Sequence, residues 1–142
     1  MKIICFTVYG NPIPKARART VRLKNGFTTT YTPQKTENWE NMIRLQILEH
    51  KPDKLIDQAI SLKAVFVLQR PKSIPKKRKY PETKPDLDNL LKSLTDAMEG
   101  IIYTNDSRIV KKEVSKVYGD PPRVEVELEV IAHAETNMAE KS

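Results

Sequence analysis

The chain has little of what disulfide, zinc or membrane proteins need. Its 142 residues include one cysteine, Cys5, and two histidines, His50 and His133. A single cysteine excludes an intrachain disulfide, and these three residues are too few for the four ligands of a structural zinc site. No apolar run approaches the roughly 20 residues that span a bilayer, so we expect no membrane-spanning role. Any metal would have to be held by carboxylates.

The first residues also lack the marks of a secretory signal. Their apolar stretch is short, alternates like a strand and ends at Gly10 and Pro12 without a small-residue cleavage site. We therefore expect a cytoplasmic protein. The length and the apolar fraction of 39% predict one globular domain, which we place at residues 1–131. The tail, residues 132–142, has little to bury and is expected to fray.

Acidic residues are scarce in the first part of the chain. Residues 1–80 carry 17 Lys and Arg against 5 Asp and Glu, and residues 81–142 carry 8 against 13. The two net charges, +12 and −5, give the +7 of the whole chain. A basic surface beside a carboxylate-bearing one is typical of a protein that grips nucleic acid. The ordinary alternative is a basic protein that is merely soluble.

Hydrophobic periodicity predicts an α/β (mixed α+β) fold in which two main helices pack on a small mixed sheet. The expected strands are residues 2–9, 59–68, 109–118 and 123–131, and the expected helices are residues 33–52 and 87–98. Thr32 is expected to cap the first helix with its hydroxyl group. The last two strands are expected to pair antiparallel around the turn at residues 119–122, and Asn25-Gly26 predicts a hairpin over residues 20–31.

Two basic segments have the pattern of neither a helix nor a central strand. In the first, Lys15, Arg17 and Arg19 stand at alternate positions and would point the same way in an extended chain. The second, residues 70–85, has four prolines among seven basic residues, which predicts a loop. A solvated charge run is the alternative, but the place of this loop just before an acidic motif favours phosphate binding. The predicted DNA-binding residues are Lys15, Arg17 and Arg19 in the first segment and Lys76, Lys77, Arg78, Lys79 and Lys84 in the loop.

The acidic motif begins where the second helix is expected to start. Asp86 and Asp88 flank Leu87, and Asp106 follows after the helix and a turn. Taken singly, each has an ordinary explanation as a helix cap, an ion-pair partner of Lys92 or a turn residue. Taken together, the three carboxylates repel one another, and a hard divalent cation such as Mg²⁺ relieves that repulsion. With Lys92 as a fixed positive charge, the set has the composition of a metal-dependent phosphodiesterase.

The motif resembles the signature of the RusA-type Holliday-junction resolvases. The residues that carry the resemblance are Asp86-Leu87-Asp88-Asn89-Leu90, Lys92, Asp96-Ala97, Asp106 and Ile109. Two other stretches are similar to the phage-associated branch of that family: residues 10–15 with Arg17 and Arg19, and residues 31–33. The likeness extends from about Phe6 to Val130.

The resemblance implies a small mixed α/β homodimer that binds four-way DNA junctions and nicks two opposed strands with Mg²⁺. It implies that Asp86, Asp88 and Asp106 hold the metal and that Lys92 is the essential lysine. The family often has two adjacent aspartates where this chain has Asn105-Asp106, which leaves fewer charges to hold the metal. The residues expected to support this catalytic set are Asp96, Asn89 and Asn105.

Two other functions fit the same residues. One is a non-catalytic protein that binds branched DNA and whose acidic cluster is structural. The other is a metal-dependent nuclease that acts on flaps or other branched DNA. Cleavage of a four-way junction with and without Mg²⁺, beside a flap substrate, separates the three functions.

Overall fold

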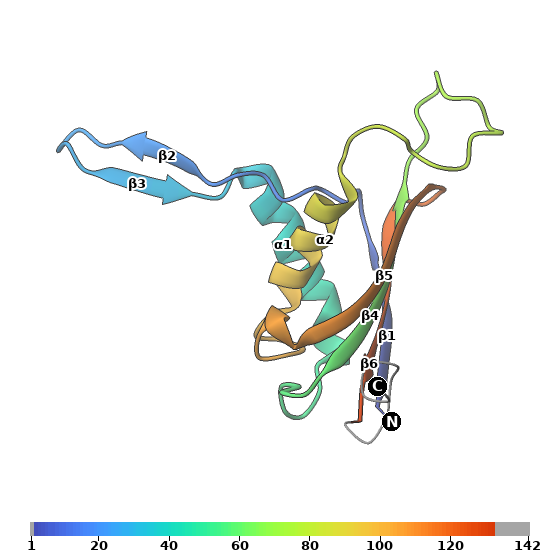
Figure 1. Cartoon of the computed structure of the whole chain (residues 1–142). Coiled ribbons are helices and arrows are strands. Elements are labelled where there is room, and N and C mark those ends of the chain that lie inside the picture. The colour runs from blue at the N-terminus through green and yellow to red at the C-terminus, as the bar shows by residue number, and fades with distance from the viewer. Residues whose placement is uncertain (1, 133–142) are drawn as a thin grey trace, which may run out of the picture.

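A computed structural model describes residues 2–132 and confirms the predicted small mixed α/β domain, with two helices on one face of a four-stranded sheet (Figure 1). The sheet contains β1 (Ile3–Tyr9), β4 (Ile60–Leu68), β5 (Ile109–Tyr118) and β6 (Arg123–Val130). The remaining elements are the hairpin strands β2 (Arg19–Arg22) and β3 (Thr28–Tyr31), the helices α1 (Gln34–Ile47) and α2 (Leu87–Met98), and the short helices η1 (Leu48–His50) and η2 (Asp106–Arg108). Apart from Ala132, the tail expected to fray lies outside the described residues.

The strand order is β1-β6-β4-β5, with β6 antiparallel to β1 and β4, and β4 parallel to β5. The predicted pairing of the last two strands is therefore wrong, because β4 lies between them. Residues 119–122 instead cross over the end of β4, where the Gly119 amide donates to the Leu68 carbonyl at 3.0 Å. Alternation shows which face a strand buries but does not show which strand it pairs with.

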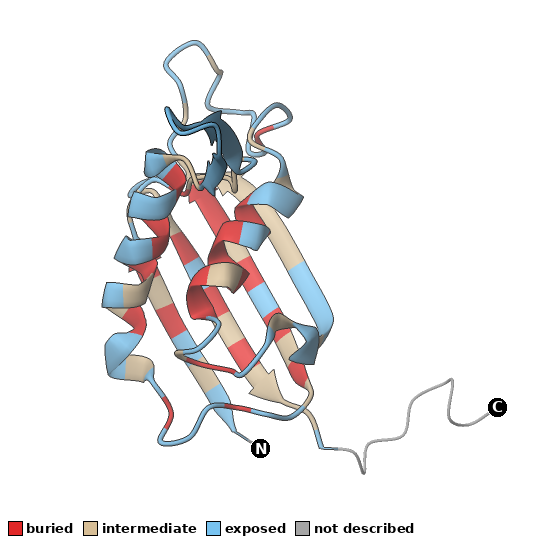
Figure 2. Cartoon of the chain, turned by 90° about the vertical axis from the view of Figure 1, so that its left-hand side faces the viewer, coloured by how far each residue is buried: buried red, intermediate tan, exposed pale blue. Residues whose placement is uncertain are grey.

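The core lies between the sheet and the two helices (Figure 2). β6 buries Val124, Val126 and Leu128 on this side, as its alternating pattern predicts. The apolar face of α2 is the predicted one, with Leu87 half-buried at its start. Its buried members are Leu90, Leu91, Leu94, Ala97 and Met98. Burial of this face fixes the direction in which the polar residues of α2 point.

The helix ends differ from the prediction at two points. The first helix was expected to continue to residue 52, but α1 ends at Ile47 and the short helix η1 follows it. Pro33 is the N-cap residue of α1 and no side chain caps this helix, so the predicted Thr32 cap is wrong. Thr32 lies one residue too early for its hydroxyl group to replace the N-cap side chain. At the C-terminal end of α2, Gly100 follows the helix with φ +85°, a conformation that glycine adopts without the steric cost of a Cβ.

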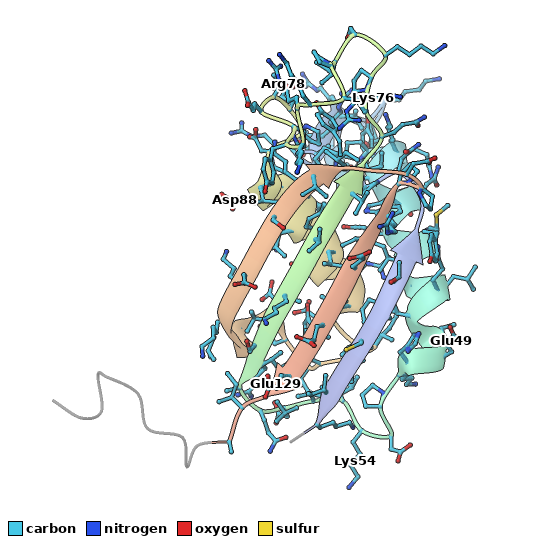
Figure 3. All side chains as sticks on the ribbon, turned by 90° about the vertical axis from the view of Figure 1, so that its right-hand side faces the viewer. Glu49, Lys54, Lys76, Arg78, Asp88 and Glu129 are labelled. Carbon is cyan, nitrogen blue, oxygen red and sulfur yellow. The ribbon has the colours of Figure 1, made fainter. Side chains whose placement is uncertain are left out.

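The second face of the sheet carries no helix among residues 2–132 (Figure 3). β1 exposes Ile3 and Tyr9 by 54% and 56%, and the glutamates of β6 lie on this face. Among the elements that the structure describes, none is a helix long and apolar enough to cross a membrane.

Candidate active site

The polar row of α2 meets the loop that follows this helix. Asp88, Lys92 and Asp96 are each separated by about one turn of α2 and lie off its buried face. The Lys92 ammonium donates a 2.8 Å hydrogen bond to Oδ1 of Asp96. The same nitrogen lies 3.6 Å from Oδ2 of Asp106. The fold therefore brings Asp106 back to the α2 row across the turn, and Lys92 lies between two carboxylates.

Two neighbours hold Asp106 at the start of η2. Its backbone amide donates to Oε1 of Glu99 at 2.9 Å, a contact that links the turn to the end of α2. The Asn105 side chain accepts a hydrogen bond from the Ser107 amide at 2.8 Å. The Asn105 oxygen is thus engaged in shaping the turn. No pattern in the sequence marks Glu99, because its contact with Asp106 depends on the path of the chain after Gly100.

A cavity of about 410 Å³ opens beside this row, between α2 and the start of β5. Its lining residues are Leu62, Asp88, Leu91, Lys92, Thr95, Asp106, Ile109, Val110, Lys111 and Lys112. Ile109 pairs with Ile60 but Lys111 pairs with Ser61, so Val110 is an extra residue in β5. This bulge places Lys112 beside Leu62, on the helix-covered face. Strict alternation assigns Lys112 to the opposite face, which explains why the sequence reasoning missed it.

The ordinary explanations for the first two aspartates do not hold in this fold. Asp86 is the N-cap residue of α2, yet its side chain makes no cap hydrogen bond. Lys92 pairs with Asp96 and Asp106, and within residues 2–132 no ion pair joins it to Asp88. The carboxylates of Asp86 and Asp88 therefore have neither of the structural roles considered for them.

The structure tests how well these carboxylates suit a metal. In the described part of the chain, no three His, Cys, Asp or Glu side chains lie close enough together to hold a metal ion. Asp88 and Asp106 line the cavity, whereas Asp86 does not. Two carboxylates still suit Mg²⁺, which keeps several waters and takes substrate phosphate oxygens as further ligands. The donor set therefore fits a metal that binds together with its substrate.

Lys15 lies between the two helices and is half-buried, whereas Arg17 and Arg19 are exposed. Its Nζ is 2.8 Å from Oε2 of Glu40, a buried residue of α1, and 3.2 Å from Oδ2 of Asp96. The prediction that Lys15 shares the direction of the two arginines is therefore wrong. Its ammonium is paired with two carboxylates, so Lys15 is not an exposed cation as Arg17 and Arg19 are.

Hydrogen bonds from both helices hold the segment that carries Lys15. The bonds are Ser93 Oγ to the Ile13 carbonyl at 2.8 Å, the Lys15 amide to the Asn89 carbonyl at 2.8 Å, and Thr36 Oγ1 to the Pro14 carbonyl at 3.2 Å. Backbone contacts of this kind depend on tertiary packing and leave no trace in hydrophobic periodicity. They explain why Lys15 turns inward where simple alternation predicts a surface position.

The ion pairs form one continuous row, Glu40–Lys15–Asp96–Lys92–Asp106. The hydrogen bond with Asp96 raises the pKa of Lys92, and the charge of Asp106 adds to this effect against some loss of hydration. Burial acts to lower the pKa of Lys15, but its bonds with Glu40 and Asp96 outweigh burial and leave the pKa raised. Both lysines therefore stay protonated at neutral pH. Lys92 therefore keeps a fixed positive charge at the cavity.

Tyr103 lies buried beneath this row. Its hydroxyl group donates a 2.6 Å hydrogen bond to the Thr95 carbonyl. Burial raises the pKa of Tyr103 far above its ordinary value, and the nearby carboxylates of Asp106, Glu99 and Asp96 raise it further. The phenol stays protonated at every physiological pH, so Tyr103 supports the helix backbone and is not a proton acceptor.

The basic loop, residues 70–85, extends beyond the sheet at the end of the molecule where α2 begins (Figure 1). Figure 3 shows Lys76 and Arg78 at the same end as Asp88. The loop has neither helix nor strand, as predicted, and its five candidate DNA-binding residues are exposed. Lys116 of β5 donates to the carbonyls of Thr83 at 2.7 Å and Pro85 at 2.9 Å, which fixes the end of the loop next to Asp86. This anchor was not predicted.

The site combines two carboxylates and the protonated Lys92 at one cavity, and an exposed basic loop extends from the end of the molecule where α2 begins. These are features of an enzyme that cuts a phosphate backbone. A family model described as Endodeoxyribonuclease RusA matches residues 9–129. The chain belongs to this family, as its acidic motif indicated, and is an endodeoxyribonuclease.

The chain is also similar to three known proteins, two of which are named crossover junction endodeoxyribonucleases. The chain is 35% identical over 136 residues to the uncharacterized protein YqaN of Bacillus subtilis, covering 89% of this chain and 95% of that protein. It is 31% identical to the crossover junction endodeoxyribonuclease rusA of Lactococcus phage r1t, covering 76% of this chain and 82% of the relative. It is 34% identical to the crossover junction endodeoxyribonuclease RusA of Aquifex aeolicus, covering 74% and 73%.

Proposed function

We propose that this endodeoxyribonuclease resolves four-way DNA junctions by paired, Mg²⁺-dependent nicks on opposed strands. The observation that carries the proposal is that Asp88, Lys92 and Asp106 line one cavity. Asp88 lies at the end of the molecule where the basic loop extends (Figure 3). The names of the phage and Aquifex relatives support the choice of a crossover junction as the substrate.

Each residue of the site has a distinct role in this proposal. Asp88 and Asp106 would hold Mg²⁺, and Asp86, which does not cap α2, is the third candidate ligand. When bound, the ion would neutralise phosphate charge and lower the pKa of a coordinated water. Lys92 stays protonated and can stabilise the negative charge that develops on the phosphate. Asp96 orients Lys92 through its 2.8 Å hydrogen bond.

In this proposal, two groups of exposed basic residues hold the DNA backbone. Arg17 and Arg19 are exposed in the segment that leads away from Lys15. The basic loop supplies the other contacts, which are Lys76, Lys77, Arg78, Lys79 and Lys84. Because these side chains are exposed and charged, their contribution to affinity depends on salt through counterion release. We place the reaction in the cytoplasm, where DNA is reached without export.

A homodimer follows from the proposed reaction. Each chain has one catalytic row, and release of two duplexes from a four-way junction needs two nicks, so two copies must act together. A closed pair related by a two-fold axis buries the same patch on each copy. The helix-free face of the sheet suits this contact, because a second copy could bury the exposed side chains of Ile3 and Tyr9 there. The same face carries charges of both signs, with Lys63 4.0 Å from Glu127, which a self-complementary contact requires. Light scattering tests the proposal: a dimer mass supports it, and a monomer mass at concentrations that cut junctions contradicts it.

The test of function uses a mobile four-way junction, a flap and a linear duplex, each with labelled strands, in Mg²⁺ or in EDTA. The proposal predicts symmetric cuts in two opposed strands of the junction that require Mg²⁺. Cutting of the flap in preference to the junction would replace it with the flap-nuclease function. Binding without cutting in any metal would indicate the non-catalytic alternative.

A further inference from the structure

The β2–β3 hairpin stands clear of the rest of the molecule. Figure 1 shows it projecting from the helices, away from the sheet. Its two strands pair only with each other, in the register Arg19↔Tyr31 to Arg22↔Thr28, and every residue from 17 to 31 is exposed. An isolated two-stranded hairpin is at best marginally stable in water. A projection that buries nothing of its own is therefore suited to a partner.

The charge of the hairpin defines that partner as a polyanion. The segment from residue 15 to residue 36 contains no Asp or Glu. Arg17, Arg19, Arg22 and Lys24 are all exposed along it. Within the proposed function this polyanion is DNA, and the inference below rests on that function.

The exposed apolar residues of the hairpin share one face. Because Arg19 pairs with Tyr31 and Val21 pairs with Thr29, the odd-numbered residues of both strands point to the same side. The exposed fractions on that side are 39% for Val21, 43% for Leu23, 70% for Phe27 and 45% for Tyr31. The opposite side is polar and includes the Thr20–Thr30 hydroxyl contact at 3.2 Å.

The tip holds its two apolar residues in a defined turn. The Leu23 amide donates to the Phe27 carbonyl at 2.7 Å, and the Gly26 amide donates to the Leu23 carbonyl at 3.0 Å. Asn25 Oδ1 accepts from the Phe27 amide at 3.0 Å, and Gly26 adopts φ +89°. An ordered turn thus presents an aromatic ring to solvent, although burial of such a ring stabilises a protein by about 1.5–3 kcal/mol.

We propose that Leu23 and Phe27 form a wedge that packs against unstacked bases at the branch point of a DNA junction, while Arg17, Arg19 and Arg22 contact the flanking phosphates. Apolar side chains of this kind separate base steps, and an aromatic ring stacks on a base of any identity. In a continuous duplex the wedge must first break a base stack, which costs a few kcal/mol. At a branch point, stacking is already interrupted, so the wedge favours branched over linear DNA.

The attachment of the hairpin supports this placement. Lys15, which is ion-paired to Asp96 of the catalytic row, lies four residues before Arg19, the first residue of β2. The segment between them is short, so the hairpin begins directly beside the catalytic row. A wedge at the branch point would then help to place the scissile phosphates near the two copies of the site.

The experiment measures 2-aminopurine fluorescence at the branch point of a four-way junction in EDTA, where no cutting occurs. Binding of the wild-type protein is expected to raise the fluorescence because the reporter base is unstacked. Phe27→Ala is expected to abolish the rise and to weaken junction affinity about tenfold, while affinity for a linear duplex stays unchanged. Phe27→Trp keeps an aromatic ring and is expected to keep both properties. Val21→Ala, on the same face but away from the tip, is the matched control and is expected to behave as wild type.

Three results would overturn the wedge. If Phe27→Ala raises the fluorescence and binds the junction as wild type does, the tip does not touch the branch point, although the variant would still cut and the proposed function would stand. Equal losses of affinity for junction and linear duplex would make the tip a general DNA contact. If the wild-type protein binds both DNAs equally, the wedge gives no preference for branched DNA and is refuted, whereas the proposed function is decided separately by cutting of the junction in Mg²⁺. The melting temperature of each variant should match wild type, because the hairpin buries no core residue.

Discussion

Replacing Lys15 with methionine separates two roles for this residue, that of a phosphate contact and that of a residue that positions the catalytic row. Glu40 has only 6% of its side chain exposed and lies 2.8 Å from Lys15. Removal of one partner from a buried ion pair costs about 3–5 kcal/mol. We expect a smaller loss, about 2 kcal/mol, because Lys15 is one-quarter exposed and Arg44 lies 4.0 Å from Glu40. This loss lowers the melting temperature by roughly 8 °C in a domain of this size.

Lys15→Met should also slow cleavage without weakening DNA binding. Asp96 contacts Lys15 through one oxygen and Lys92 through the other, so loss of Lys15 frees Asp96 to turn and Lys92 loses its fixed position. We expect the single-turnover rate on a junction to fall about tenfold while Kd stays within about twofold. If Lys15 contacted phosphate instead, affinity would fall and the slope of log K against log salt would shrink by about 0.9. That result would refute the positioning role.

Two controls sharpen the test. Adding Glu40→Leu to Lys15→Met removes the unpaired buried carboxylate and should restore stability, but the cleavage rate should stay low because Asp96 still lacks its second cation. Recovery of both stability and cleavage rate would show that Lys15 has only a structural role.

The contribution of Lys15 to folding stability depends on pH with a defined sign. Since folding raises the pKa of Lys15, the stability that it contributes is fully present below its ordinary pKa of 10.5 and is lost as pH rises through the higher folded-state pKa. Wild type and variant should therefore differ in stability at pH 7 and converge only at strongly alkaline pH.

Three further predictions concern the site. The first concerns the variants Asp86→Asn, Asp88→Asn and Asp106→Asn, which weaken metal binding and reduce repulsion of phosphate. Each should abolish cleavage in a cleavage assay and leave junction affinity unchanged or higher in a gel-shift assay. Full activity of any two would contradict the assignment. Lys92→Ala should reduce the single-turnover rate at least a hundredfold with little change in Kd, and an equal change in both would make Lys92 a binding residue. Neutralising four residues of the basic loop together should weaken binding and lower the magnitude of the salt slope by up to about 3.6, and an unchanged slope would show that the loop does not touch DNA. The four are Lys76, Lys77, Arg78 and Lys79.

The sequence predicted what depends on local pattern. The bounds of α2 follow from helical periodicity and agree with the structure, as do five of the six apolar residues predicted to be buried. Leu87 is half-buried, and Ser93 and Thr95 are buried without having been predicted. The hairpin around Asn25-Gly26 follows from local turn chemistry in the same way. The family assignment rested on the acidic motif, whose spacing is also local.

What the sequence did not predict depends on contacts between distant residues. The place of β4 between β5 and β6 is set by the whole sheet, and the bulge at Val110 that redirects Lys112 has no pattern of its own. Lys15 alternates with Arg17 and Arg19, and only the packing of two helices around it turns it towards Glu40. The anchoring of the basic loop by Lys116 is likewise a tertiary contact. The site was therefore predictable in composition and only in part in geometry.

The central claim is that a two-fold pair, with one catalytic row in each copy, cuts both opposed strands of a junction. The most direct test mixes wild-type protein with the Asp88→Asn variant and follows a supercoiled plasmid that extrudes a cruciform. The account predicts that mixed dimers convert the plasmid to nicked circles and rarely linearise it, because each mixed dimer has one working site. Linearisation that stays at the wild-type level as the inactive variant comes into excess would contradict the claim.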